Sequence, residues 1–250
     1  MSQLTSKEPK PHSRWVRMSH WIVTVSFLAL ALTGIEMIMV HPRFYWGEAG
    51  NDLTPALFEV PLGRNYQHGG YTALVPFNDQ PGAPASASRT YDIFNQNGWG
   101  RSLHFLSGWT LTITGLIYLV AGMVSGHFRR NVLPRRTEMT RGNFWSDVRA
   151  HLKMEIPDAM GGPHYGLLQK STYAVVIFVL LPVIALSGMT MSPAITAAYP
   201  FLLKIFFGAQ SARTIHFFCS AALELFLLVH IVMIIKSGWK VQIKAMTFGK

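Results

Sequence analysis

Four long apolar stretches alternate with polar segments along the chain. They are 21 to 25 residues long, contain no lysine or arginine, and cover residues 18–40, 102–126, 171–191 and 214–235. At about 1.5 Å of rise per residue, helices of this length cross the roughly 30 Å hydrocarbon core of a bilayer. The pattern predicts a four-transmembrane-helix bundle, an all-α membrane protein, rather than the shorter amphipathic helices of a soluble bundle.

Lysine and arginine are concentrated in alternate polar segments. Residues 1–17, 127–170 and 236–250 hold 16 of the 22, and residues 41–101 and 192–213 hold the other six. The positive-inside rule therefore predicts that both termini and the inner loop 127–170 are cytoplasmic, with the outer loop 41–101 on the opposite side. The whole chain, residues 1–250, is expected to form a single integral-membrane domain.

The overall composition excludes several classes of protein. Half of the residues are apolar and 14% are charged, which is not typical of a disordered chain or a nucleic-acid binder. The net charge of +10 is then mainly a signal of topology, with a contribution to binding anionic membrane lipid. A single cysteine, Cys219, excludes a disulfide framework, a cysteine-ligated metal centre and a c-type haem attachment.

The polar segments contain three further features. The outer loop is rich in glycine, proline and aromatic residues, which indicates an irregular cap or a docking surface. Residues 199–207 form a short apolar stretch that predicts an interfacial helix, and residues 144–154 predict an amphipathic one.

Four of the ten histidines lie inside the apolar stretches: His20, His104, His216 and His230. An imidazole within a membrane normally faces the helix bundle and has a partner there. His216 and His230 are 14 residues apart, which is close to four helical turns, so they share one face at depths about 21 Å apart. With the predicted topology, His104 and His216 lie near the outer surface, and His20 and His230 lie near the inner surface.

Two imidazoles from facing helices are the axial ligands that a six-coordinate haem iron needs. The histidines therefore predict two haem sites, one held by His104 and His216 and the other by His20 and His230. The alternative is a haem-free transporter or structural protein in which the same side chains serve proton coupling or packing.

The charged side chains near these histidines have more than one possible role. Arg14 and Arg17 on the inner side, and Arg101 and Arg213 on the outer side, are expected either to pair with haem propionates or to anchor the helices at the interface. The acidic residues inside the apolar stretches are Glu36 and Glu224. Glu224 lies between the two histidine depths, where a carboxyl group serves proton relay, gating or structure.

Four sequence motifs resemble the bacterial dihaem cytochrome b family, which includes cytochrome b561 and the membrane subunits of formate dehydrogenase, nickel–iron hydrogenase and thiosulfate reductase. The motifs span all four apolar stretches: RWVRMSHW at residues 14–21, GRSLHFLSGW at 100–109, HYGLLQKSTY at 164–173 followed by LLPVIALSGM, and RTIHFF followed by LLVHI at the last two histidines.

The resemblance implies two b haems and a quinone that reacts near the inner one. Gln169, Lys170 and Tyr173 are then candidate quinone-site residues, with anchoring of the third helix as the other interpretation. It also implies a bacterial inner-membrane subunit that exchanges electrons between quinone or quinol and a periplasmic oxidoreductase, for which a molybdopterin enzyme is one candidate. A free-standing cytochrome b561-like enzyme that passes electrons from superoxide or another small donor to quinone is the alternative within the family.

Overall fold

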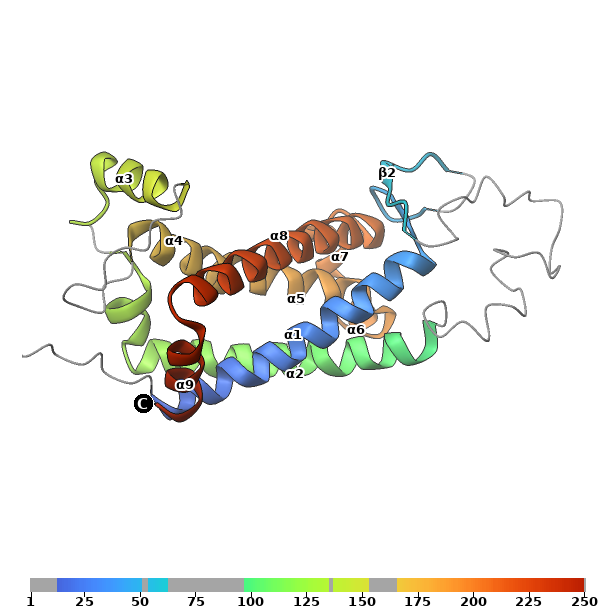
Figure 1. Ribbon diagram of the computed structural model, residues 1–250. Coiled ribbons are helices and arrows are strands. Elements are labelled where there is room, and N and C mark those ends of the chain that lie inside the picture. The colour runs from blue at the N-terminus through green and yellow to red at the C-terminus, as the bar shows by residue number, and fades with distance from the viewer. Residues whose placement is uncertain (1–12, 51–53, 63–96, 135–136, 153–165, 250) are drawn as a thin grey trace, which may run out of the picture. The chain divides into compact units, whose positions relative to one another are not determined.

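The computed structural model describes residues 13–50, 54–62, 97–134, 137–152 and 166–249. Most of the predicted outer loop and part of the inner loop lie outside these ranges. The described residues are mostly helical, with one short hairpin and irregular connecting segments (Figure 1). Four helical stretches are long and apolar enough to cross a membrane, which confirms the predicted fold class. The cytoplasmic location of the termini and the single-domain organisation remain predictions.

The first, second and fourth of these stretches are single helices. They are α1 (Arg14–Val40), α2 (Asn97–Val124) and α8 (Ala209–Lys236). None contains a proline, so each backbone ladder runs without interruption. Each begins before the predicted apolar stretch, because the helix continues into the polar residues at the membrane surface. The second predicted stretch extends two residues beyond α2, which is followed by a turn at Gly126, where φ is +66°.

The third stretch is divided by a π-helical turn. It consists of α4 (Leu167–Val175), η6 (Val176–Leu180) and α5 (Leu181–Thr190). Pro182 has no backbone N–H and would crowd the carbonyl four residues earlier in a regular helix. The N–H of Leu181 instead bonds to the carbonyl of Val176, five residues back. The predicted inner loop ended at residue 170, but its last residues belong to α4.

Shorter elements connect these stretches. They are β1 (Arg43–Phe44), β2 (Phe58–Glu59), η5 (Phe128–Val132), α3 (Arg141–Leu152), α6 (Pro193–Ala198), α7 (Phe201–Ile205) and α9 (Trp239–Phe248). Helix α3 begins three residues before the predicted amphipathic segment, and α7 lies inside the predicted interfacial one. The antiparallel pairing of β1 with β2, in which Arg43 faces Glu59, was not predicted.

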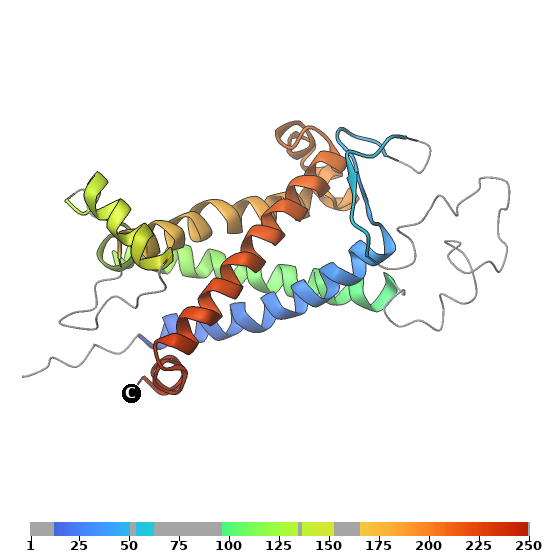
Figure 2. The same ribbon diagram turned by 45° about the horizontal axis from the view of Figure 1, so that its top comes forward.

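Contacts between Cα atoms divide the chain into two compact units. The first comprises Met1–Trp21, Thr114–Pro182 and Leu223–Lys250. In it, α3 lies beside the beginning of α4 (Figures 1 and 2). The second comprises Ile22–Ile113 and Val183–Ala222. In it, the β1–β2 hairpin lies at the N-terminal end of α8 (Figure 2).

Polarity is distributed as in a membrane protein. Large apolar side chains such as Leu28 and Leu116 are more than half exposed on the long helices, where lipid would cover them. Small or polar side chains are buried instead, among them Thr33 and Ser187, both with no exposed surface. Buried small and hydroxyl residues allow transmembrane helices to approach closely and to bond across their interfaces.

Candidate functional site

The outer histidines face each other within the second unit. His104 on α2 and His216 on α8 have ring centres 6.2 Å apart, with their planes at 54°. The structure therefore brings together the pair that helix spacing and topology predicted.

A hydroxyl group on α1 determines which nitrogen of His104 carries the proton. The Thr33 hydroxyl oxygen lies 2.9 Å from His104 Nδ1, and the hydroxyl group itself donates to the backbone carbonyl of Ala29 at 2.7 Å. Because its hydrogen is used in that bond, Thr33 accepts a hydrogen bond from Nδ1–H. The other ring nitrogen, Nε2, is then unprotonated and retains the lone pair that a metal ligand requires.

His216 is held in the same tautomer by a backbone carbonyl. Its Nδ1 lies 3.0 Å from the carbonyl oxygen of Ile184, which can only accept a hydrogen bond, so Nδ1 must be the donor. The Ser187 hydroxyl lies 3.1 Å from the same nitrogen. Gly188 follows Ser187 on α5, and a Cβ atom added to it would lie 3.3 Å from Cε1 of the His216 ring. A residue without a side chain thus allows α5 to approach the imidazole closely.

The segment after α1 fixes the first turn of α8. The carbonyl oxygen of Gly47 accepts hydrogen bonds from the N–H groups of Gln210 at 3.0 Å and Ser211 at 3.2 Å, and the Glu48 carboxylate accepts one from Ala209 at 3.3 Å. These N–H groups have no partner within the helix. Their bonds hold the beginning of α8, and the position of its histidine follows from that anchoring.

The inner histidines face each other within the first unit. His20 on α1 and His230 on α8 have ring centres 6.4 Å apart, with their planes at 52°. The ring of Phe226, one turn earlier on α8, stacks on His230 at 5.8 Å and 18°. The ring of Tyr173 meets Phe226 edge-on at 6.0 Å. A continuous series of ring contacts thus links Tyr173 with the inner pair.

The three candidate quinone residues on α4 have different surroundings. Gln169 donates a hydrogen bond from its side-chain amide to the Tyr173 hydroxyl at 3.0 Å. Lys170 is 5% exposed, and its ammonium group bonds both carboxylate oxygens of Glu138 at 2.8 and 2.9 Å. Tyr173 therefore adjoins the inner histidines through Phe226, whereas the charge of Lys170 is directed to the inner loop.

Three of the candidate propionate arginines share a spacing from the paired histidines. Arg17, Arg101 and Arg213 each precede a paired histidine by three residues, which places both side chains on one helix face. Arg17 donates to the carbonyl of Thr247 at 3.3 Å, and its buried Nε has no hydrogen-bond partner among the described residues.

The two outer arginines contact aromatic rings. Arg101 lies 5.4 Å from the ring centre of Phe105 on the same helix. Arg213 lies 4.9 Å from the ring centre of Phe44 and donates to the backbone carbonyl of His41. The outer loop therefore helps to hold the side chain of Arg213, which lies in the second turn of α8.

The sequence identified Glu36 as an acidic residue inside an apolar stretch but assigned it no role, and the structure buries its carboxyl group in the second unit. Glu36 is 2% exposed, and neither carboxylate oxygen has a hydrogen-bond partner among the described residues. A Cβ atom on Gly100, one turn before His104, would collide with this carboxyl group. The sequence spacing could have indicated that Glu36 faces the protein interior. Glu36 follows Thr33 by three residues, so both side chains lie on the same face of α1.

The spacing of each pair fits a metal between two imidazoles. A nitrogen ligand lies about 2 Å from a transition metal and about 1.2 Å from its own ring centre, so two opposed imidazoles place their centres roughly 6.4 Å apart. No group of three or more His, Cys, Asp or Glu side chains that could hold a metal occurs in the described part of the chain. The pairs thus suit an iron whose other ligands come from a porphyrin, and the buried Nε of Arg17 suits an anionic substituent.

Comparisons with known proteins show which family the chain resembles. A family model described as prokaryotic cytochrome b561 matches residues 11–249. A protein of Azospira oryzae, named provisionally as the protein-methionine-sulfoxide reductase subunit YedZ1, is 26% identical over 226 residues, which cover 89% of each chain. No solved structure matches the chain significantly.

Proposed function

Because this chain belongs to the prokaryotic cytochrome b561 family of membrane haem proteins, we propose that it is a dihaem subunit carrying electrons between quinone and a periplasmic oxidoreductase. The main support for this proposal is the tautomer of each outer histidine, His104 and His216. Both Nδ1 atoms are used as donors, to Thr33 and Ile184, so each ring retains a lone pair on Nε2 for iron.

Each histidine pair holds one b haem in this proposal. His104 and His216 would hold the iron of the outer haem, and His20 and His230 would hold that of the inner haem. When bound, the haems supply reversible one-electron chemistry. The protein orients the ligands through Thr33 and Ile184 and stacks Phe226 against His230. Arg17, Arg101 and Arg213 would pair with the haem propionates.

The quinone is proposed to react near the inner pair. The ring contacts from Tyr173 through Phe226 to His230 support this location. Gln169 orients the Tyr173 hydroxyl, which is placed to exchange a hydrogen bond with a quinone oxygen. Lys170 contributes by fixing the beginning of α4 to Glu138.

The name of the Azospira oryzae relative suggests which oxidoreductase is the partner of this chain. That protein is described as a subunit of a protein-methionine-sulfoxide reductase, so a sulfoxide reductase is the oxidoreductase we propose, with molybdopterin as its candidate cofactor. Reduction of a sulfoxide to a sulfide and water consumes two electrons and two protons. A quinol supplies two electrons, so electrons would pass from the quinol through this chain to the outer face. Both termini are proposed to be cytoplasmic, as the positive-inside rule predicts from the lysines and arginines of the polar segments.

Reduction by a soluble quinol tests the proposal. The purified, haem-containing chain is mixed with duroquinol, and the absorbance of reduced b haem is followed. Both haems are expected to be reduced, and Tyr173→Phe is expected to slow the reaction about tenfold. Tyr199→Phe, which changes an exposed tyrosine between α6 and α7, is the matched control. If dithionite reduces the haems but the quinol does not, the quinone link is wrong.

A further inference from the structure

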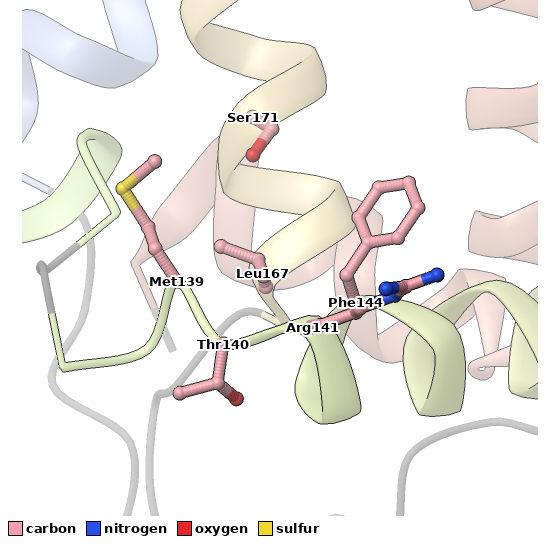
Figure 3. A pocket seen from close by; sticks show the side chains of 6 residues that line it. All are labelled: Met139, Thr140, Arg141, Phe144, Leu167 and Ser171. Carbon is pink, nitrogen blue, oxygen red and sulfur yellow. The ribbon is translucent and has the colours of Figure 1, made fainter.

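A cavity of about 390 Å³ lies between the beginning of α3 and the beginning of α4, within the first unit (Figure 3). It belongs to neither histidine pair. Six residues line it: Met139, Thr140, Arg141, Phe144, Leu167 and Ser171.

The walls of the cavity are mainly apolar. Met139 and Phe144 lie on either side of Leu167 in Figure 3, with Ser171 beyond it. The side chains of Met139 and Phe144 are 63% and 42% exposed. Such exposed apolar groups at the edge of a transmembrane helix suit a hydrocarbon chain.

The charge at the cavity is positive. Arg141 is exposed, and its side chain forms no hydrogen bond or ion pair with any described residue. The neighbouring carboxylates have other partners, since Glu138 bonds Lys170 and Asp147 accepts a hydrogen bond from the N–H of Leu168 at 3.0 Å. The guanidinium group therefore complements an anion from outside the protein.

The cavity faces away from the inner histidines. Leu167 and Ser171 are four residues apart and share one face of α4, whereas Tyr173 lies about 200° around the helix from Ser171. Tyr173 is the residue whose ring leads through Phe226 to His230. An electron-exchanging quinone would need the Tyr173 side, so the position of the cavity favours a ligand without a redox role.

The surroundings match the headgroup region of a membrane. Helix α3 has 12 residues, about 18 Å of helix, which is too short to span a bilayer. Trp145, the residue after Phe144 on α3, is 51% exposed, and tryptophan is enriched at membrane interfaces. We propose that this cavity binds one anionic phospholipid, with Arg141 on the phosphate and Met139, Phe144 and Leu167 against an acyl chain.

Native mass spectrometry of the haem-containing full chain tests the site. The probes are phosphatidylglycerol, phosphatidylcholine, inorganic phosphate and menadione. One phosphatidylglycerol is expected to bind more tightly than phosphatidylcholine. Arg141→Gln is expected to weaken that binding about fivefold, as for one basic residue at a membrane surface. Ser171→Leu, which fills the cavity and leaves the arginine in place, should weaken it as well.

Arg149→Gln is the matched control, because it removes the same charge from another exposed position of α3 that does not line the cavity. It should leave phosphatidylglycerol binding unchanged. Equal binding of the two lipids, with no effect of Arg141→Gln, would overturn the proposal. Displacement of the lipid by inorganic phosphate alone, or loss of menadione binding in Ser171→Leu, would also overturn it in favour of a free-phosphate or quinone site.

Discussion

The imidazole of His104 donates a hydrogen bond from Nδ1 to the hydroxyl oxygen of Thr33, 2.9 Å away. A residue of α1 thus fixes the ring and the tautomer of a proposed haem ligand on α2. A hydrogen bond at this nitrogen makes the imidazole a stronger electron donor through Nε2, which favours the oxidised metal. The contact between Thr33 and His104 is therefore expected to lower the potential of the outer haem.

Thr33→Val should raise that potential and leave the haem in place. Valine has the shape of threonine without the hydroxyl group, so the ligand loses its partner but not its packing. A hydrogen bond worth about 1 kcal/mol corresponds to about 40 mV for one electron. Potentiometric titration of the two haems measures the shift.

Thr110→Val is the control for this experiment. The Thr110 hydroxyl bonds the carbonyl of Leu106 on its own helix at 2.8 Å, away from any paired histidine. The two potentials should not change in this variant. An unchanged outer potential in Thr33→Val would show that the hydrogen bond does not act on the haem.

Gly188→Val should displace His216. A Cβ atom alone would lie 3.3 Å from Cε1 of the imidazole, and the two further methyl groups of valine need space that the ring occupies. The outer haem is expected to fall to less than half occupancy, with the inner haem retained. Gly115→Val, at a glycine with nothing within 4 Å of its added Cβ, should keep both haems. Full occupancy in Gly188→Val would contradict the close packing of α5 on this ligand.

The ion pair between Lys170 and Glu138 should stabilise the protein rather than bind quinone. Lys170→Met leaves a partly buried carboxylate without its cation, which is expected to lower the free energy of unfolding by about 1–3 kcal/mol. Adding Glu138→Gln should restore most of the loss, because no charge then lacks a partner. Thermal unfolding of both single variants and the double variant measures the coupling. If Lys170→Met instead raises the KM for quinol and Glu138→Gln does not reverse it, the lysine acts on the substrate.

Gly208→Ala should disrupt the anchoring of α8. Gly208 has φ of +111°, and an added Cβ would collide with the backbone carbonyl of Gly47. The strain is expected to cost about 1–3 kcal/mol. Differential scanning fluorimetry in detergent should show a lower Tm. In Gly142→Ala, where nothing lies within 4 Å of the new Cβ, the Tm should stay the same or rise slightly.

The sequence predicted those parts of the structure that depend on helix periodicity. Four apolar stretches specify four long helices, and the 14-residue spacing of His216 and His230 specifies one shared face. The motifs then identified the family. The π-helical turn at Val176–Leu180 had a signal in Pro182, but a proline in a transmembrane helix also permits a simple kink.

The partners of the histidines could not be predicted in the same way. Thr33 and Ser187 are recognisable as polar residues in apolar stretches, yet their sequence positions do not show which ring nitrogen they meet. Those contacts depend on how one helix is rotated against another. The β1–β2 hairpin has two residues in each strand, too few for an alternating pattern. The pairing of Lys170 with Glu138 joins residues that are 32 positions apart, a separation that no helical spacing connects.

Haem stoichiometry in single-histidine variants tests the central claim most directly. Pyridine haemochrome analysis should give two b haems per wild-type chain. His104→Ala and His230→Ala should each give one, with the remaining haem low-spin by electron paramagnetic resonance. One haem or none in the wild-type chain, or two haems in either variant, would contradict the assignment of the four histidines as two ligand pairs.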